Sequence, residues 1–178
     1  MRQDIETLYE GRYLRLLQKG QWEYAERTNA GSAVIVIAVT PEGNLLFVEQ
    51  FRIPIGAASI EMPAGLVGDL DALDTIEAAA KRELLEETGW QAGKVDVLMI
   101  GPSSSGMSNE MVAFARATEL VKIHEGGGDA SENITVHAVP VSEAPMWLAS
   151  KMRAGYAMDA KLWAGLWLID RNPDGSAA

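Results

Sequence analysis

Cysteine is absent from the 178-residue sequence. Its absence excludes disulfide bonds, thiolate metal sites and thiol nucleophiles. Disulfides persist mainly in oxidising compartments, so a chain without them fits a reducing one. We therefore expect a cytoplasmic protein whose chemistry relies on oxygen and nitrogen groups.

Long hydrophobic runs are also missing. The longest apolar stretch, Ala33 to Val39, is far shorter than the roughly 20 residues that a membrane-spanning helix needs. The first residues, Met1 to Glu6, lack the apolar core of a secretory signal. We expect neither export nor a membrane partner.

Positive charge is scarce. Lys and Arg number 15 against 25 Asp and Glu, which gives a formal net charge of −10. Such a chain repels nucleic acid, so we expect no nucleic-acid partner. It would also repel a phosphorylated substrate unless a cation intervened, and this makes a metal ion compatible with the composition.

The remaining pattern predicts one domain of strands, a helix, more strands and two further helices. Lys19-Gly20 lies between two strand-like segments and indicates a hairpin. We expect Asp74 to cap the first helix with Glu77 completing a capping box, Gly89 to end it, and Ser142 to cap the second. The expected strands cover 13–17, 22–27, 32–39, 45–50, 59–62, 94–100, 111–117 and 134–139, and the helices 75–88, 142–152 and 159–169. This order predicts an α/β (α+β) fold with a mixed β-sheet sandwiched between helices.

Three carboxylates share one face of the first helix. Glu83, Glu86 and Glu87 fall within roughly a 100° arc at the α-helical repeat. Ala79 and Ala80 lie on the same side and would let the helix approach a sheet closely. A Glu-rich face is most often simply solvated, but gathered carboxylates also form metal sites, and oxygen-only ligands favour Mg²⁺ or Mn²⁺.

The string around these carboxylates favours the metal site. Residues 82–90, Arg-Glu-Leu-Leu-Glu-Glu-Thr-Gly-Trp, resemble the second half of the Nudix hydrolase signature, Arg-Glu-aliphatic-any-Glu-Glu-any-Gly-aliphatic. The first half departs from that pattern. Its acidic position falls on Asp74 instead of Glu, and the loop from Gly65 is longer than usual, although Gly68 restores the nominal spacing.

Other segments resemble one branch of this superfamily, the ADP-ribose and ADP-sugar pyrophosphatases. They are Trp22-Glu23 with Arg27, residues 48–52 (Val-Glu-Gln-Phe-Arg), 60–65 (Ile-Glu-Met-Pro-Ala-Gly), 102–110 and 132–136. The resemblance implies the Nudix fold with three parts. These are an N-terminal antiparallel β extension over 1–30 that contacts a dimer partner or the substrate, a hydrolase domain over 31–171 and a flexible tail over 172–178.

The resemblance also implies a metal site. Glu83 and Glu87 correspond to its main ligands, joined by the carbonyl of Ala64, and Glu86 would bind directly or through water. Mg²⁺ is the expected cofactor, with Mn²⁺ as an alternative. Arg82 would pair with a neighbouring carboxylate and orient it.

A late loop would supply one more carboxylate. Glu132 corresponds to a further ligand or to the general base that takes a proton from the attacking water. Members of the branch differ on this position, and Asp129 is the alternative base.

Substrate contacts follow from the same resemblance. Trp22 would stack on adenine, and the further contacts implied are Glu23, Arg27, Arg52, Met107 and Ser108. We also expect a homodimer whose N-terminal strands help to build the partner's substrate site, because the N-terminal strand resembles a substrate-contacting one and the C-terminal region is rich in Trp and Met, as interfaces often are.

The implied reaction is hydrolysis of the pyrophosphate bond of ADP-ribose or a related nucleoside diphosphate sugar. The products would be a nucleoside monophosphate and a sugar phosphate. A Nudix hydrolase for a non-adenine nucleotide sugar such as GDP-mannose remains an alternative, because the sequence identifies no residue that recognises the edge of the nucleobase. A non-catalytic nucleotide-sugar sensor is the alternative from another class, and the three intact carboxylates disfavour it.

Overall fold

The computed structural model describes residues 4–69, 73–128 and 133–178. Its elements, in chain order, are β1 (Ile5–Glu10), β2 (Leu14–Lys19), β3 (Trp22–Arg27), β4 (Ser32–Ala38), β5 (Asn44–Arg52), the 3₁₀ turn η1 (Ile53–Ile55), β6 (Ala57–Glu61), β7 (Ala64–Val67), α1 (Ile76–Thr88), β8 (Trp90–Pro102), β9 (Met111–Lys122), β10 (Thr135–Pro140), α2 (Ala144–Arg153), β11 (Ala157–Met158) and α3 (Lys161–Trp167).

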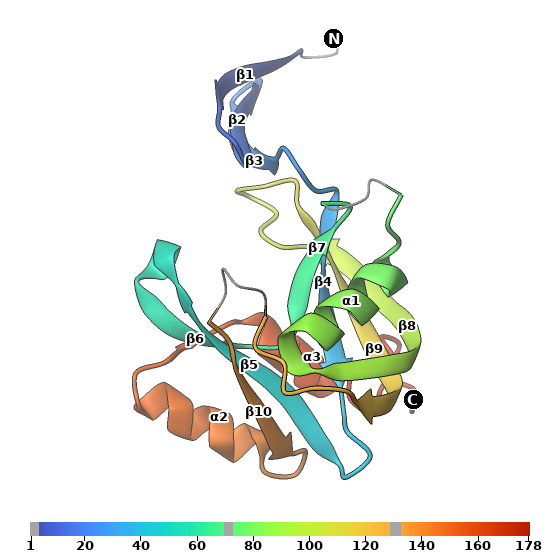
Figure 1. Ribbon diagram of the computed structural model, residues 1–178. Helices are drawn as coiled ribbons and strands as arrows, with labels where there is room; N and C mark the ends of the chain where they lie inside the picture. The colour runs from blue at the N-terminus through green and yellow to red at the C-terminus, as the bar shows by residue number, and fades with distance from the viewer. Residues whose placement is uncertain (1–3, 70–72, 129–132) are drawn as a thin grey trace.

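The body contains two sheets with helices on either side (Figure 1). The strand orders are β7-β4-β9-β8 and β10-β5-β6-β11. Strand β4 runs parallel to β9 and antiparallel to β7, so the first sheet is mixed. One core joins this sheet to α1, and a second joins its other face to β5, β6, α2 and α3. The predicted fold class, a mixed sheet sandwiched between helices, is confirmed.

Strand β4 explains why its sequence reads as a continuous apolar run. Val34 and Val36 belong to the core under α1, whereas Ile35 and Ile37 belong to the core under α2 and α3. A strand covered on both faces needs apolar side chains at successive positions, not at alternate ones. The strand therefore forms the centre of the body.

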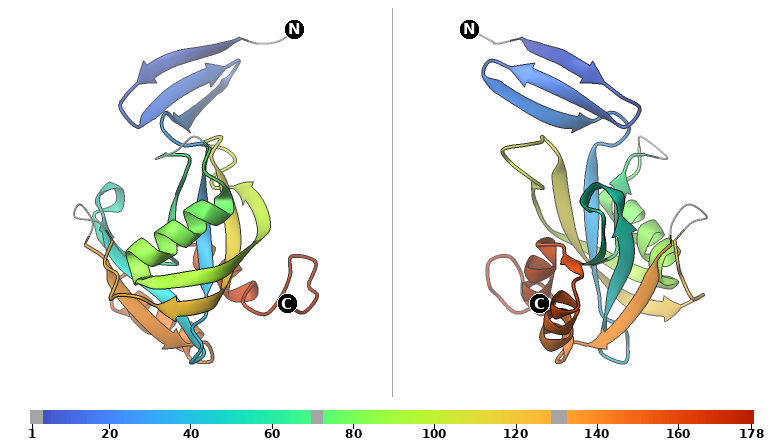
Figure 2. Two further views of the ribbon diagram at one scale, coloured as in Figure 1. Left: turned by 45° about the vertical axis from the view of Figure 1, so that its right-hand side comes forward. Right: turned by 90° about the vertical axis from the view of Figure 1, so that its left-hand side faces the viewer.

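The N-terminal sheet, ordered β1-β2-β3, stands away from the body (Figure 2). The predicted hairpin is present, with Lys19 opposite Trp22 across the turn. Every side chain of β1 is exposed, and Leu17 is the one buried residue among the three strands. Apolar side chains left exposed on this part of the chain are Ile5, Leu8, Tyr9, Tyr13, Leu14, Leu16 and Trp22. The sheet has almost no core of its own, so it lacks the usual source of independent stability.

The start of α1 differs from the expectation. Thr75, not Asp74, is the N-cap, and its side chain accepts a hydrogen bond from the Ala78 N–H at 3.2 Å. The expected capping box of Asp74 and Glu77 is therefore wrong. Asp74 is one residue too early and faces Arg82 at 3.4 Å instead. Gly89 ends the helix as predicted, in the left-handed conformation with φ 73°.

Later in the chain, the structure also differs from the expected caps and boundaries. Helix α2 has Glu143 at its N-cap with no side-chain cap bond, so the expected role of Ser142 is wrong. Helix α3 is shorter than expected, and the strands β1, β7 and β11 were not expected. Strand β7 includes Gly65 and pairs with β4, so its extended form depends on tertiary pairing more than on local propensity.

The C-terminal residues fold back on themselves. The Asn172 N–H donates to the Ser176 carbonyl at 2.8 Å, and the Ala178 N–H donates to the Asp170 carbonyl at 3.0 Å. The flexibility expected of this tail stays a prediction. Within the described ranges, no helix is both long enough and apolar enough to cross a membrane.

The cap assignment leads to a prediction about stability. Thr75→Ala should lower the free energy of unfolding by about 1 kcal/mol, because it removes the acceptor for the Ala78 N–H. The measurement is urea unfolding followed by circular dichroism. Ser142→Ala is the control and should change stability little, since the Ser142 side chain is not the cap of α2. Equal losses in the two variants would contradict the assignment.

Candidate active site

Helix α1 brings two carboxylates to the start of β7. Glu87 is 3% exposed, and its Oε2 accepts a hydrogen bond from the Ala64 N–H at 3.0 Å. The Glu83 carboxylate lies so close to Gly65 that a Cβ added there would be 1.9 Å from the Glu83 Cδ. Only glycine permits this approach, because no real Cβ could occupy that space. Both carboxylates therefore gather at the Ala64–Gly65 segment.

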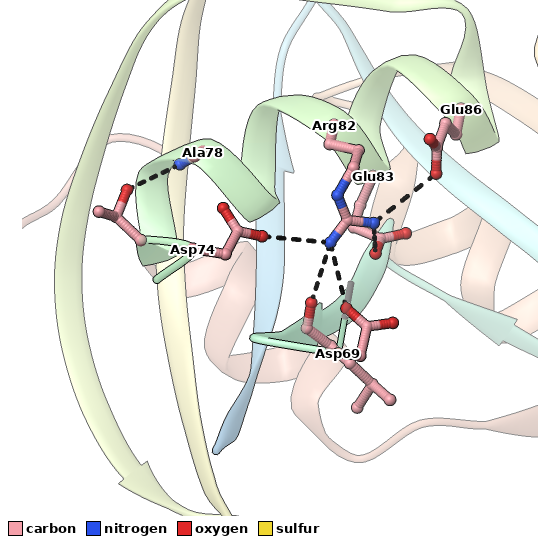
Figure 3. A network of polar contacts seen from close by, with 8 residues as sticks. Asp69, Asp74, Ala78, Arg82, Glu83 and Glu86 are labelled. Carbon is pink, nitrogen blue, oxygen red and sulfur yellow. Dashed lines mark hydrogen bonds and ion pairs between the residues drawn. The ribbon is translucent and has the colours of Figure 1, made fainter. Parts of the chain in front are cut away.

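Arg82 organises the acidic groups around it (Figure 3). Its Nη1 donates to the Glu83 Oε1 at 2.6 Å and lies 3.8 Å from the Glu86 Oε2. Its Nη2 donates to the Leu66 carbonyl at 3.2 Å. The same nitrogen lies 3.4 Å from Asp69 and from Asp74. One guanidinium thus connects α1 to β7 and to the loop that follows it.

Burial and the surrounding charges shift the pKa of the Glu83 carboxyl group. Burial raises its pKa to about 7, with the negative charges of Glu86 and Asp69 adding to the rise and the contact with Arg82 opposing it. A cation placed beside this carboxylate would favour its charged form. The carboxylate is thus a group that a metal ion would stabilise.

A cleft of about 420 Å³ opens beside this carboxylate. Its lining combines charged groups with small and apolar ones. The described residues of this wall are Arg27, Ala33, Ile35, Arg52, Glu61, Ala64, Gly65, Leu66, Asp69, Glu83, Ser103, Glu110, Val112, Asp159 and Lys161. Of the residues expected from the sequence, Ala64, Glu83, Arg27 and Arg52 meet here.

Each cation of the cleft already has an acidic partner. Arg27 donates to Glu110 at 2.5 Å, and Lys161 lies 2.8 Å from Asp159. Arg52 donates from Nε and Nη2 to both oxygens of Glu61, at 2.8 and 2.7 Å. Among the described residues, five carboxylates and three cations therefore line the cleft, and their formal charge is negative.

The cations of the cleft also change the pKa of Glu110. Burial raises its pKa, but hydrogen bonds from Arg27 and Ser103 and the positive charges of Arg27 and Lys161 outweigh burial. The net effect holds the pKa of Glu110 below its ordinary value. Glu110 is therefore a charged acceptor in the cleft.

Several expected substrate contacts lie outside the cleft of their own chain. Trp22 is 66% exposed at the far end of β3, and Glu23 beside it is exposed. Met107 is 68% exposed. The loop of Met107 and Ser108 packs along β3, where the Ala25 N–H donates to the Met107 carbonyl at 2.8 Å. None of these four residues lines the cleft beside Glu83 in the single chain.

Other site residues were either outside the described ranges or not expected. The base candidates Glu132 and Asp129 lie in the segment that is not described. Glu61, Glu110, Asp159 and Lys161 line the cleft but were not assigned to it. Glu61 and Glu110 fall within segments whose resemblance to the branch was noted, so the sequence offered a signal for them. Asp159 and Lys161 follow no such motif.

The residues present fit a divalent cation. Within the described ranges, no three acidic or imidazole side chains form a complete metal site by themselves. Glu83 and Glu87 nevertheless approach one peptide segment, and the glycine at position 65 keeps that approach open. Oxygen ligands of this kind suit Mg²⁺, which usually retains several waters and needs few protein ligands.

Comparisons with known proteins identify the family to which the chain is similar. Residues 29–158 match the NUDIX domain family. A protein of Bacillus methanolicus, a methanol dehydrogenase activator, is 30% identical over 153 residues, which cover 82% of this chain and 81% of that protein. An ADP-ribose pyrophosphatase of Bacillus subtilis is 33% identical over 146 residues, which cover 78% of this chain and 77% of that protein.

A solved structure shares the fold. The crystal structure of an ADP compounds hydrolase superposes with a TM-score of 0.71 and covers 93% of this chain and 89% of its own, at 18% identity. At this identity the likeness concerns the fold alone. Because the family match extends over most of the chain, the protein belongs to the Nudix family.

The close approach at Gly65 predicts a defect in metal binding. Gly65→Ala should displace the Glu83 carboxylate and weaken Mn²⁺ binding by about ten- to hundredfold, as disruption of groups that support metal ligands does. Isothermal calorimetry without substrate provides the measurement. Gly101→Ala is the control, because its Cβ would meet only the Met99 Cε at 3.9 Å. Unchanged Mn²⁺ binding in Gly65→Ala would contradict the prediction that Glu83 is a metal ligand.

Proposed function

We propose that this Nudix protein hydrolyses the pyrophosphate bond of ADP-ribose or a related nucleoside diphosphate sugar. The products would be a nucleoside monophosphate and a sugar phosphate. The observation that carries this proposal is the cleft, which is lined both by the Glu83 carboxylate and by the guanidinium groups of Arg27 and Arg52. A pyrophosphate needs positive charge on both sides, and this cleft can supply it once a cation binds the carboxylates. The similarity to a named ADP-ribose pyrophosphatase supports the substrate class.

A divalent cation is the proposed cofactor, with Mg²⁺ as the natural ion and Mn²⁺ as an alternative. Glu83, Glu87 and the carbonyl of Ala64 are its proposed ligands, and half-exposed Glu86 would bind at the rim. When bound, the cation would neutralise charge on the pyrophosphate and lower the pKa of a water. Arg82 holds Glu83 in position and connects it to the Leu66 carbonyl.

The arginines of the cleft would bind the substrate's phosphates. A guanidinium carries five N–H donors in a planar array that matches phosphate oxygens. The contact from the Arg27 Nε to Glu110 fixes the plane of that group and occupies one donor. The Arg52 plane is fixed by its two contacts with Glu61. Arginines held in this way need little reorganisation when the substrate arrives.

Proton transfer requires one more carboxylate. Glu132 is the proposed general base or an additional cation ligand, and Asp129 is the alternative base. A carboxylate in this role takes the proton of the attacking water. The water oxygen bonds to one phosphorus, the bond from that phosphorus to the bridging oxygen breaks, and the bridging oxygen leaves with the other phosphate. No covalent bond to the protein is needed.

Hydrolysis of a panel of nucleotide sugars with Mg²⁺ tests the function. We expect ADP-ribose to give AMP and ribose 5-phosphate, with the products identified by mass. GDP-mannose and other non-adenine nucleotide sugars in the same panel test the alternative base preference. Binding of these compounds without any product would support a nucleotide-sugar sensor instead.

Two variants connect that activity to the carboxylates. Glu83→Gln and Glu87→Gln should each lower turnover by orders of magnitude, because each loses a charged ligand. Both should fold, since Gln keeps the size of the side chain and, at position 87, an acceptor for the Ala64 N–H. Circular dichroism provides the control. Near wild-type turnover at saturating Mg²⁺ would reject the ligand assignment.

A homodimer is the proposed assembly, with the N-terminal extension of one chain serving the cleft of its partner. Strand β3 has Arg27 at its cleft end and Trp22 at its far end, and six extended residues span roughly 16 Å. Trp22 is therefore far from the cleft that Arg27 lines. The described wall of the cleft contains no aromatic ring on which a base could stack. The exposed apolar side chains of the N-terminal sheet suit burial against a second copy in a C₂ pair.

Trp22→Ala tests this arrangement. If Trp22 stacks on the base, its loss should raise KM about tenfold with little effect on kcat, because a base–aromatic stack contributes about 1–3 kcal/mol. Light scattering gives the oligomeric state, and steady-state kinetics gives KM. Trp167→Ala, which removes a 54% exposed Trp from α3 outside the cleft, is the control. A fully active monomer would reject the dimer, and an unchanged KM in Trp22→Ala would reject the stacking role.

A further inference from the structure

The start of α3 reaches the cleft from the C-terminal part of the chain. Strand β11 pairs in parallel with β6, with Met158 beside Ile60. The Asp159 N–H then donates to the Ile60 carbonyl at 3.2 Å, and both Asp159 and Lys161 line the cleft. Glu61, the last residue of β6, lines the same cleft. Residues 159–161 therefore form one wall of the cleft, and no sequence motif predicted their place there.

Two contacts fix the position of this wall. At the middle of α3, a Cβ on Gly165 would lie 2.2 Å from the Met62 Sδ, so only glycine lets the helix pack this closely against the residue before Pro63. At the other end, Arg116 donates from Nη2 to the carbonyls of Leu168 and Arg171, at 2.8 and 2.6 Å. The helix that follows residues 159–161 is thus held by buried packing and by hydrogen bonds, which restricts the movement of the wall.

The chemistry of the wall combines a donor with an acceptor. The Lys161 backbone N–H and Nζ both contact the Asp159 Oδ1, at 2.9 and 2.8 Å. An ammonium carries three donors, and a carboxylate has acceptor capacity on two oxygens. The Lys161 side chain is 40% exposed. An adjacent donor and acceptor of this kind suit hydroxyl groups, which donate and accept at once.

The surroundings of the wall also suit a polyol. The described lining contains Ser103 and Glu110 near Arg27, but no aromatic ring. The charge of Lys161 acts on Glu110, so the two groups share one polar environment. A nucleobase would find no aromatic ring on this described wall, whereas a sugar would find charged acceptors and donors around it.

We infer that Asp159 and Lys161 form the subsite for the sugar that the pyrophosphate links to the nucleoside. Lys161 donates to a hydroxyl oxygen of that sugar, and Asp159 accepts from a hydroxyl group. The two residues thereby favour substrates that carry a polyhydroxylated group beyond the pyrophosphate. This inference rests on the proposed hydrolysis of nucleotide sugars.

The test compares two substrates that differ only in the distal group. ADP-ribose carries the sugar, and the methyl ester of ADP keeps the pyrophosphate linkage without one. Lys161→Met should raise KM for ADP-ribose about tenfold or more, the usual effect of losing a hydrogen bond from a charged group, and change kcat little. KM for the methyl ester should not change. Lys161→Arg, which keeps a charged donor, should recover part of the loss.

Two further variants separate binding from folding. Lys94→Met removes a lysine that pairs with Asp96 at 2.7 Å outside the cleft, and should behave as wild type. Asp159→Asn keeps an acceptor for the Lys161 N–H at the start of α3, and should raise KM for ADP-ribose alone. Equal increases in KM for both substrates, or no increase in Lys161→Met, would overturn the inference.

A direct binding measurement keeps this test independent of turnover. Calorimetry with ribose 5-phosphate should show binding to the wild-type protein and to Lys94→Met, and at least about tenfold weaker binding to Lys161→Met. If the wild type hydrolysed neither substrate, the proposed function would fail, and the calorimetry would still decide the subsite. Absent binding to the wild type, or equal affinity in all three proteins, would overturn the subsite.

Discussion

The close contact between the Glu83 carboxylate and the Gly65 backbone is the constraint on which the site depends. It requires a glycine in β7, a helix packed tightly enough to deliver the carboxylate, and a counter-charge for a group that burial would otherwise keep protonated. Arg82 supplies that charge. Its hydrogen bond to the Leu66 carbonyl fixes the helix to the strand. Arg82 thus both compensates the charge of Glu83 and holds the helix against the strand.

The Met62–Gly65 segment is held from both sides of the sheet. Glu87 bonds to the Ala64 N–H from α1, while Gly165 lets α3 pack against Met62 from the opposite layer. Each helix belongs to a different core, so this segment lies where the two cores meet. A proposed ligand carbonyl on this segment would have little freedom to move. Such rigidity is what a metal site needs from the groups around its ligands.

Local sequence signals predicted the features that depend on neighbours along the chain. The helix of α1, its end at Gly89 and the hairpin at Lys19-Gly20 are of this kind, as is the acidic face that matched the Nudix signature. Predictions failed where contacts between distant parts of the chain determine the local structure. Asp74 has the composition of a cap, but Arg82 engages it and Thr75 takes the cap position. The wall at Asp159 exists only because β11 pairs with β6, almost a hundred residues earlier, and no local pattern shows that pairing.

The ion pairs of the cleft explain how an acidic protein can bind an acidic substrate. Arg27, Arg52 and Lys161, the cations of the described wall, each have a carboxylate partner and remain partly exposed. The partners also hold the cationic groups at defined positions in the cleft. The formal charges of these three pairs cancel, which leaves Glu83 and Asp69 as the excess negative charge of the described wall. A divalent cation would offset that excess, and a pyrophosphate would then meet a described wall with no net negative charge to repel it.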